Sequence, residues 1–338
     1  MSKRLFFPLV ILTIFSMLFS ACAQTPGASN GKLIVVATTT LIGDVAAKVG
    51  GDLIELSVMM PAGADPHSFE PAPADLSKVA DADLVLVNGI EFEGFLEKLI
   101  ENAGDEAKVV TVSEGIETIA FVEGADEHAD EEHADEEHAD EEHADEEHAD
   151  EEHVDEEHAH DHGEFDPHVW QDPNNVIVWV NQMADALSAR DSANAATYRA
   201  NADVYIAELQ TLDTWIKEQV AQIPEANRRL VTEHGTLGYF AARYGFEVVG
   251  AAIPGFSTLA EPSAQELAEL ADDIRDLDVK AIFVGNTVNA NVASQIAQDT
   301  GIQLVPIYTD SLSPADGPAA SYLDFMKFNV EAIVGALK

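Results

Sequence analysis

The chain has 338 residues and a formal charge of −45 at pH 7, and 46% of its residues are hydrophobic. This length and composition are enough for two domains with apolar cores. The acidic excess argues against a nucleic-acid partner, because phosphates attract lysine and arginine. It suits a protein that handles cations outside the cytoplasm, although solubility alone would account for it equally well.

The N-terminus has the features of a secretory signal. Two basic residues precede an apolar run over 5–19, and Ser20 and Ala21 follow as small residues before a cleavage point. The run is short for a permanent transmembrane helix. We therefore expect residues 1–21 to be a signal peptide that directs the chain out of the cytoplasm.

Cys22 is the only cysteine of the chain, so no intramolecular disulfide is expected. Residues 18–22 resemble a bacterial lipoprotein signal, in which this cysteine receives the lipid, although Phe19 stands where leucine is usual. We expect lipidation at Cys22 and a flexible tether over 22–31. The alternative is a soluble secreted protein with an incidental cysteine.

Short apolar runs then alternate with helical patterns in two halves of the chain. Such β-branched runs, bounded by glycine, aspartate or asparagine, are typical of buried parallel strands joined by helices. The expected strands cover 33–37, 53–59, 84–87, 109–112, 229–232, 247–250, 281–284 and 303–307. We predict an α/β protein with two lobes, over 32–193 and 225–338, each built on a four-stranded, mainly parallel sheet.

One long linking helix is expected between the lobes, within 194–224. Its apolar residues recur at three-, four- or seven-residue spacing and form one stripe, which comprises Tyr198, Tyr205, Leu209, Leu212, Ile216 and Val220. Pro224 ends the pattern. At about 1.5 Å per residue the helix spans roughly 40 Å, enough to run along both lobes as a strut. The alternative is an ordinary core helix of one lobe.

Most histidines of the chain lie in one acidic tract over 126–162. The tract repeats every five residues and contains no lysine or arginine. Its dense like charge and lack of large apolar residues predict disorder, in a loop of the first lobe. The tract histidines are His128, His133, His138, His143, His148, His153, His158, His160 and His162.

The other three histidines, His67, His168 and His234, each follow an expected strand or precede an expected helix. Ligands bind α/β sheets beyond the carboxyl ends of the strands, so these side chains can converge in the cleft between the lobes. Asp310 follows the last expected strand in the same way. Three imidazoles and a carboxylate form a good ligand set for Zn²⁺, whereas each histidine alone would more often have a core or capping role.

Four segments resemble motifs of the ZnuA/TroA-like family, the metal-binding lipoproteins of ABC importers. They are the "DPHSFEPAPAD" segment over 65–75, "DPHVWQDP" over 166–173, His234 followed by "YFAARYG" over 239–245, and "DSL" over 310–312. The resemblance covers about 32–338. It implies two α/β lobes joined by a rigid helix, with the metal between them. Carried over position by position, it implies the metal ligands His67, His168, His234 and Asp310.

The resemblance also bears on the metal. Family members with histidine as third ligand lean towards zinc and those with glutamate towards manganese, so His234 favours Zn²⁺, with Mn²⁺ or iron as the alternative. A histidine-rich acidic loop between the first two motifs marks the zinc members. We therefore expect the tract to be a low-affinity zinc collector or sensor, against the alternative of a neutral spacer.

Orientation of the imidazoles and their protonation can also be anticipated. Glu70, Asp166 and Glu233 are candidates to orient the rings, although Asp166 is equally suited to cap a helix. Trp170 is expected to pack rather than bind metal. Ordinary histidine pKa values predict that metal affinity falls below roughly pH 6.

Two rival functions have less support in the sequence than metal capture. A zinc hydrolase would need an open coordination position and a base, for which Glu70 or Glu233 would have to serve, and the chain has no HExxH segment. A surface adhesin has no sequence feature in its favour. We expect a monomer, not an enzyme, anchored by lipid to the outer face of the bacterial membrane or periplasmic. Its expected partners are an importer permease and a cytoplasmic ATPase, because the chain lacks a phosphate-binding GxxxxGK[ST] loop.

Overall fold

The computed structural model describes residues 31–95, 99, 101, 108–120, 165–254, 258 and 260–338. The chain divides into two units, Met1–Lys32 and Leu33–Lys338, and both sheets lie in the second. The expected signal peptide, Cys22 and the acidic tract with its nine histidines lie outside the described residues. Among the described helices, none is both long enough and apolar enough to span a bilayer.

The first sheet consists of parallel strands in the order β2-β1-β3-β4. Helices cover both of its faces, which explains why its strands are almost continuously apolar. Val35 and Leu86 belong to the same core cluster as residues of α2 and α5, whereas Val36 and Val85 share a cluster with Val79 of α3. The elements of this lobe are β1 (Leu33–Ala37), α2 (Thr40–Gly50), β2 (Ile54–Val58), α3 (Pro73–Asp81), β3 (Leu84–Val87), β4 (Val109–Thr111) and α5 (Pro173–Arg190).

The second sheet repeats this plan with the order β6-β5-β7-β8, again parallel throughout. Val231 and Ile282 share one core cluster with residues of α8 and α9, whereas Leu230 and Phe283 face a cluster that includes residues of α7 and α10. The elements of this lobe are β5 (Arg229–Thr232), α7 (Gly238–Tyr244), β6 (Glu247–Ala251), α8 (Ala264–Asp276), β7 (Ala281–Val284), α9 (Asn291–Thr300), β8 (Gln303–Pro306) and α10 (Tyr322–Leu337).

The predicted fold class is confirmed, since each lobe has a four-stranded parallel sheet with helices. Every observed strand agrees with its expected range to within one residue at either end. The strand order within each sheet was not predicted. In both sheets the first strand of the lobe lies inside the sheet, and the chain crosses from one side of it to the other.

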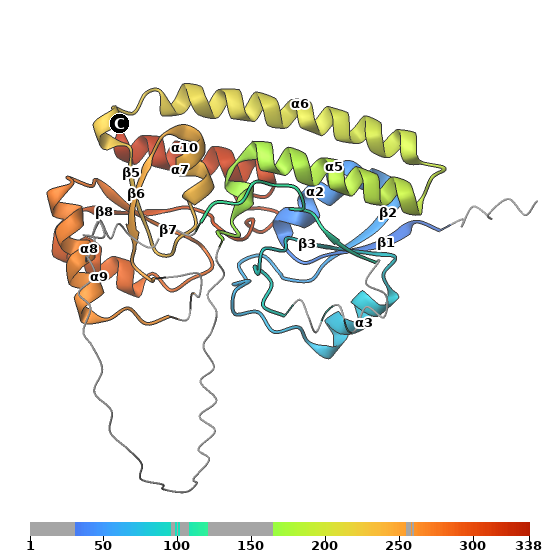
Figure 1. Cartoon of the computed structure of the whole chain (residues 1–338), viewed down its shortest axis with the longest axis horizontal. Helices are drawn as coiled ribbons and strands as arrows, with labels where there is room; N and C mark the ends of the chain where they lie inside the picture. The colour runs from blue at the N-terminus through green and yellow to red at the C-terminus, as the bar shows by residue number, and fades with distance from the viewer. Residues whose placement is uncertain are drawn as a thin grey trace, which may run out of the picture. The chain divides into compact units, whose positions relative to one another are not determined.

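The long helix α6 (Ala195–Val220) contacts helices of both lobes, as a strut should. It packs against α2 and α5 of the first lobe and against α10 of the second (Figure 1). All six residues of the expected apolar stripe are buried. The helix has 26 residues, so it is about 40 Å long.

A polar cluster around Asp213 fixes α6 laterally. The Asp213 carboxylate accepts hydrogen bonds from Lys217 at 2.6 Å, from Arg243 at 3.2 Å and from the Tyr244 hydroxyl at 3.1 Å. Asn174, at the start of α5, also donates to it at 3.3 Å. These bonds satisfy a nearly buried carboxylate and join α6 to a helix of each lobe.

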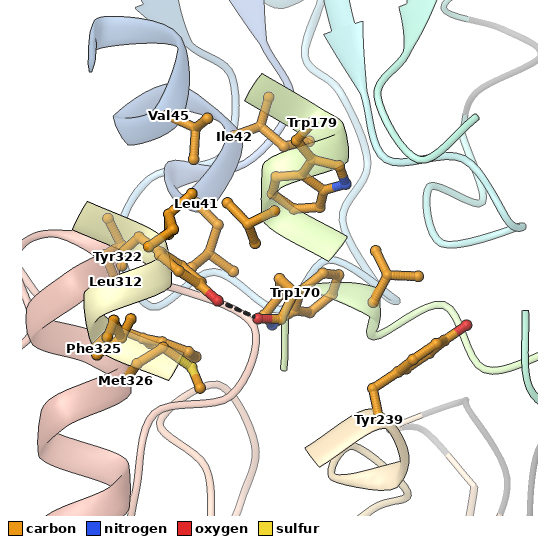
Figure 2. Close-up of a cluster of buried hydrophobic side chains, with 14 of the residues drawn as sticks. Leu41, Ile42, Val45, Trp170, Trp179, Tyr239, Leu312, Tyr322, Phe325 and Met326 are labelled. Carbon is orange, nitrogen blue, oxygen red and sulfur yellow. Dashed lines mark hydrogen bonds between the residues drawn. The ribbon is translucent and has the colours of Figure 1, made fainter. Parts of the chain in front are cut away.

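One apolar core continues from the first lobe into the second. Figure 2 shows Leu41 and Ile42 of α2 and Trp179 of α5 in the same cluster as Tyr322 and Phe325 of α10. Hydrogen bonds made by Trp170 and Tyr322 cross this junction. The Trp170 indole nitrogen donates to the Thr309 carbonyl oxygen at 2.8 Å, and the Tyr322 hydroxyl donates to the Trp170 carbonyl oxygen at 2.7 Å. The lobes are therefore fastened together on the side of the helices.

Candidate metal centre

The four predicted ligands come from four separate loops. His67 lies in the turn after β2, and His168 immediately precedes the short 3-10 helix η3 (Val169–Gln171) that leads into α5. His234 follows β5, and Asp310 follows β8. Parallel strands end at the same sheet edge, so the last two side chains are brought together at one edge of the second sheet.

The structure brings all four side chains together. One potential ligand atom from each lies within 4.8 Å of the others. Nε2 of His168 is 3.3 Å from Nε2 of His67 and 3.6 Å from Oδ1 of Asp310, and Nε2 of His234 is 3.6 Å from Oδ2 of Asp310. Donors about 2 Å from a tetrahedral zinc ion lie roughly 3.3 Å apart, and these three separations are close to that value.

Asp166 orients His168 through one carboxylate oxygen. Its Oδ1 atom lies 2.7 Å from Nδ1 of the ring and accepts the backbone N–H of His168 at 2.8 Å. This contact directs Nε2 towards the cluster, as a carboxylate behind a metal-binding histidine does. The helix-capping alternative for Asp166 was wrong for α5, because Asp172 caps it by accepting the backbone N–H of Asn174.

The two second-lobe residues are oriented in the same manner. Nδ1 of His234 lies 3.0 Å from Oε1 of Glu233, which leaves Nε2 free to face the cluster. Oδ2 of Asp310 accepts hydrogen bonds from the hydroxyl groups of Thr287 and Thr309, each at 2.9 Å. Both side chains are thus fixed by neighbours that do not belong to the cluster.

Two atoms of the cluster lack any hydrogen-bond partner although they are buried, Nε2 of His234 and Oδ1 of Asp310. Burying a polar atom without a partner is costly, and native structures rarely tolerate it without a reason. Both atoms are good ligands for a divalent cation. A cation within the cluster would satisfy both of them.

Three of the four side chains have shifted pKa values. Burial and the neighbouring His168 lower the pKa of His67 to about 3, so its imidazole is neutral. Burial also opposes protonation of His234, but Asp310 and Glu233 outweigh it and raise its pKa to about 9. Burial likewise disfavours the Asp310 carboxylate, yet the three histidines hold its pKa below the usual range.

The sequence did not predict that an aromatic ring, that of Phe92, packs against the candidate ligands. Phe92, in the loop after β3, is buried with its ring centroid 5.1 Å from that of His67, at an interplanar angle of 86°. Glu93 anchors this loop by accepting hydrogen bonds from Thr38 at 2.7 Å and from the backbone N–H of Asn88 at 2.7 Å. No local pattern distinguishes such a residue from an ordinary core phenylalanine.

The remaining predicted residues have separate outcomes. Trp170 is buried and packs at 5.3 Å from the His168 ring without offering a ligand atom, as expected. Glu70 is exposed and makes no described contact with a cluster histidine, so its predicted orienting role was wrong. Asp65 holds the His67 turn instead, accepting the backbone N–H of His67 at 3.0 Å and the Thr258 hydroxyl of the second lobe.

Comparison with known proteins gives matches over almost the whole chain. A family model described as "Zinc-uptake complex component A periplasmic" matches residues 35–336. The manganese-binding lipoprotein MntA of Halalkalibacterium halodurans is 31% identical over 338 residues, which is 99% of each chain. The iron ABC transporter substrate-binding lipoprotein MtsA of Streptococcus pyogenes serotype M1 is 30% identical over 341 residues, 98% of each chain.

Solved structures agree with this picture. The manganese-bound periplasmic metal-binding protein from Candidatus Liberibacter asiaticus has a TM-score of 0.72 and 27% identity, over 91% of this chain and all of that one. The periplasmic zinc-binding protein TroA from Treponema pallidum has a TM-score of 0.74 and 25% identity, over 91% of this chain and 99% of that one. The fold and the sequence motifs therefore both match those of periplasmic metal-binding proteins.

Proposed function

Because the chain belongs to the zinc-uptake component A family, the metal-binding substrate-binding proteins of ABC importers, we propose that it captures Zn²⁺ outside the cytoplasm and delivers it for import. A substrate-binding component of this kind is a receptor rather than an enzyme. It works with a membrane permease and an ATPase. We propose His67, His168, His234 and Asp310 as the ligands of the transported ion.

One observation supports zinc above all, the donor set itself. Three imidazole nitrogens and one carboxylate oxygen suit a borderline-soft ion, whereas Mn²⁺ prefers carboxylates, carbonyls and water. Manganese is the second candidate, because relatives that match the whole chain are named manganese-binding lipoproteins. Another such relative is named an iron transporter component.

Metal titration of stripped protein is expected to separate the two candidates. Sites of mixed nitrogen and oxygen ligands generally bind Zn²⁺ more tightly than Mn²⁺, so the deciding quantity is the Mn²⁺ affinity itself. We expect one tightly bound Zn²⁺ per cleft and Mn²⁺ binding at least about a hundredfold weaker. Calorimetry with each ion would measure both constants, using protein that lacks residues 126–162.

A matched variant sharpens this test. His234→Glu exchanges one imidazole for a carboxylate and hardens the site, so the ratio of the Mn²⁺ and Zn²⁺ dissociation constants should shrink. Mn²⁺ bound by the wild-type cleft as tightly as by the His234→Glu variant would count against zinc as the cargo. It would favour the manganese alternative.

The acidic tract is proposed as a low-affinity zinc collector or sensor. Its Asp-Glu-Glu-His units offer nitrogen among oxygens, and its negative charge raises the local cation concentration. The described residues on either side of it are held together, since Ala120 and Phe165 form an antiparallel bridge and the Asp166 N–H donates to the Ile119 carbonyl oxygen at 3.0 Å. The tract can therefore be exchanged without cutting the lobe.

Replacing residues 126–162 with a glycine- and serine-rich segment of equal length is expected to lower the number of Zn²⁺ ions bound per chain. The tight site should remain, because its four ligands lie outside the tract. Equilibrium dialysis at several zinc concentrations would count the ions. An unchanged stoichiometry would leave only the spacer alternative.

The remaining expectations complete the proposed function. Cys22 is the proposed site of lipidation, which would hold the receptor at the outer face of the membrane, close to its permease. Relatives matching the full chain are named lipoproteins. The protein is proposed to act as a monomer.

A further inference from the structure

Gly285 occupies a central position behind the second-lobe half of the metal centre. It directly follows β7, which lies between β5 and β8 in the sheet. Its two spatial neighbours at this sheet edge are therefore the segment after β5 with Glu233 and His234, and the segment after β8 with Thr309 and Asp310. Gly285 itself is buried.

A side chain at position 285 would collide with both of these segments. A Cβ atom built on Gly285 would lie 2.2 Å from Oγ1 of Thr309 and 2.6 Å from Oε1 of Glu233, closer than carbon and oxygen approach in folded proteins. Both neighbours are fully buried, with exposed fractions of 0% for Thr309 and 1% for Glu233. They have no solvent-filled space into which to retreat.

The two atoms that crowd Gly285 are those that orient the proposed ligands. Oε1 of Glu233 is the oxygen that lies 3.0 Å from Nδ1 of His234. Oγ1 of Thr309 is the hydroxyl that donates to Oδ2 of Asp310 at 2.9 Å. An added atom that displaces these two oxygens would therefore change the orientation of both His234 and Asp310.

The requirement at position 285 is for space rather than for an unusual backbone. Gly285 is absent from the glycines with positive φ, which within the described residues include Gly63 and Gly89. The sign of φ at this position therefore does not require glycine. The lack of a side chain matters because Oγ1 of Thr309 and Oε1 of Glu233 lie 2.2 Å and 2.6 Å from where a Cβ atom would be.

We propose that Gly285 is a positioning residue of the metal centre, whose missing side chain lets Glu233 and Thr309 converge and hold His234 and Asp310 in ligating orientation. This inference rests on the proposed ligand set. Gly238 has a similar relation to the first-lobe half, because a Cβ atom there would lie 2.4 Å from Oδ2 of Asp166, whose other oxygen, Oδ1, orients His168. Two glycines thus make room for the two carboxylates behind His168 and His234.

The Gly285→Ala variant tests the proposal, with Gly335→Ala as its matched control. Gly335 lies on α10, where an added Cβ atom meets nothing within 4 Å. We expect Gly285→Ala to weaken Zn²⁺ binding roughly tenfold to hundredfold, the usual loss when a group behind a metal ligand is disturbed. The control should bind like the wild type. In the Co²⁺-loaded protein, the visible absorption bands of Gly285→Ala should shift, which a mere loss of stability would not cause.

A double-mutant cycle with Thr309→Ala tests whether Gly285→Ala loses Zn²⁺ affinity because its side chain collides with Thr309. Thr309→Ala removes one of the two colliding side chains, so Gly285→Ala should cost less affinity in that background than in the wild type. Equal costs in both backgrounds would contradict the proposed route. If Gly285→Ala alone does not fold, the double variant is compared with Thr309→Ala, and the displaced Glu233 should still weaken binding.

Wild-type affinity and an unchanged Co²⁺ spectrum in Gly285→Ala would overturn the proposal. Failure of the underlying ligand set would look different, because His234→Ala would then bind Zn²⁺ as tightly as the wild type. Loss of binding in His234→Ala together with normal binding in Gly285→Ala would refute the positioning role alone.

Discussion

His67→Ala is expected to weaken Zn²⁺ binding by at least about a hundredfold, on the order of 3 kcal/mol. A structural four-ligand zinc site is worth roughly 10–16 kcal/mol, so one of four ligands contributes a quarter of that. His67 suits the experiment because it is only partly buried and lies in a turn, and its removal should leave the fold intact. Its depressed pKa of about 3 also means that it binds metal without first losing a proton.

The measurement is competition for Zn²⁺ against a chelator of known affinity. Glu70→Gln is the matched control, because it alters the same segment at an exposed position that contacts no cluster histidine. It should bind like the wild type. Tight binding retained by His67→Ala would show that this side chain is not a ligand.

Zinc affinity is expected to fall about tenfold for each pH unit between pH 8 and pH 6. Burial disfavours the charged His234, but Asp310 and Glu233 outweigh it, so its pKa of about 9 leaves the ring protonated at neutral pH. Zinc needs the neutral ring and must displace that proton. A raised pKa therefore makes affinity climb with pH up to about 9, above which the slope disappears.

Calorimetry in buffers of different ionisation enthalpy would count about one proton released per Zn²⁺ at pH 7. Glu233→Gln removes one of the carboxylates that raise the His234 pKa, so this variant should release fewer protons under the same conditions. A flat affinity profile between pH 6 and pH 8, without proton release, would contradict the expectation. The raised pKa of His234 thus moves the expected onset to near pH 9, whereas ordinary histidines would place it near pH 6.

Much of the architecture was predictable because it depends on local pattern. Apolar β-branched runs give the strands, and a regular stripe from Tyr198 to Val220 gives α6. The order of strands within the sheets depends on pairing between distant segments, which composition does not encode. Sequence alone could therefore place Val36 in a strand without identifying its neighbours.

The candidate ligands were predictable for a different reason. Few histidines lie outside the tract, and all of them stand where α/β sheets bind ligands. The residues behind them were harder to foresee. Glu70 and Glu233 look alike in sequence, yet only Glu233 faces a ligand ring, because side-chain direction is set by the completed packing. Phe92, Thr309 and Gly285 carry no local signal at all.

The continuous core beneath α6 has a consequence for how the cargo departs. Swinging the lobes apart as rigid bodies would break the Trp170–Tyr322 and Trp170–Thr309 bonds and wet apolar surface on both sides at once. A smaller displacement of the turn that carries His67 exposes far less. We therefore expect the ion to leave past the turn that carries His67. It should dissociate last from the three buried ligands, His168, His234 and Asp310. The permease would then need to displace only the turn that carries His67 and would not need to separate the two lobes.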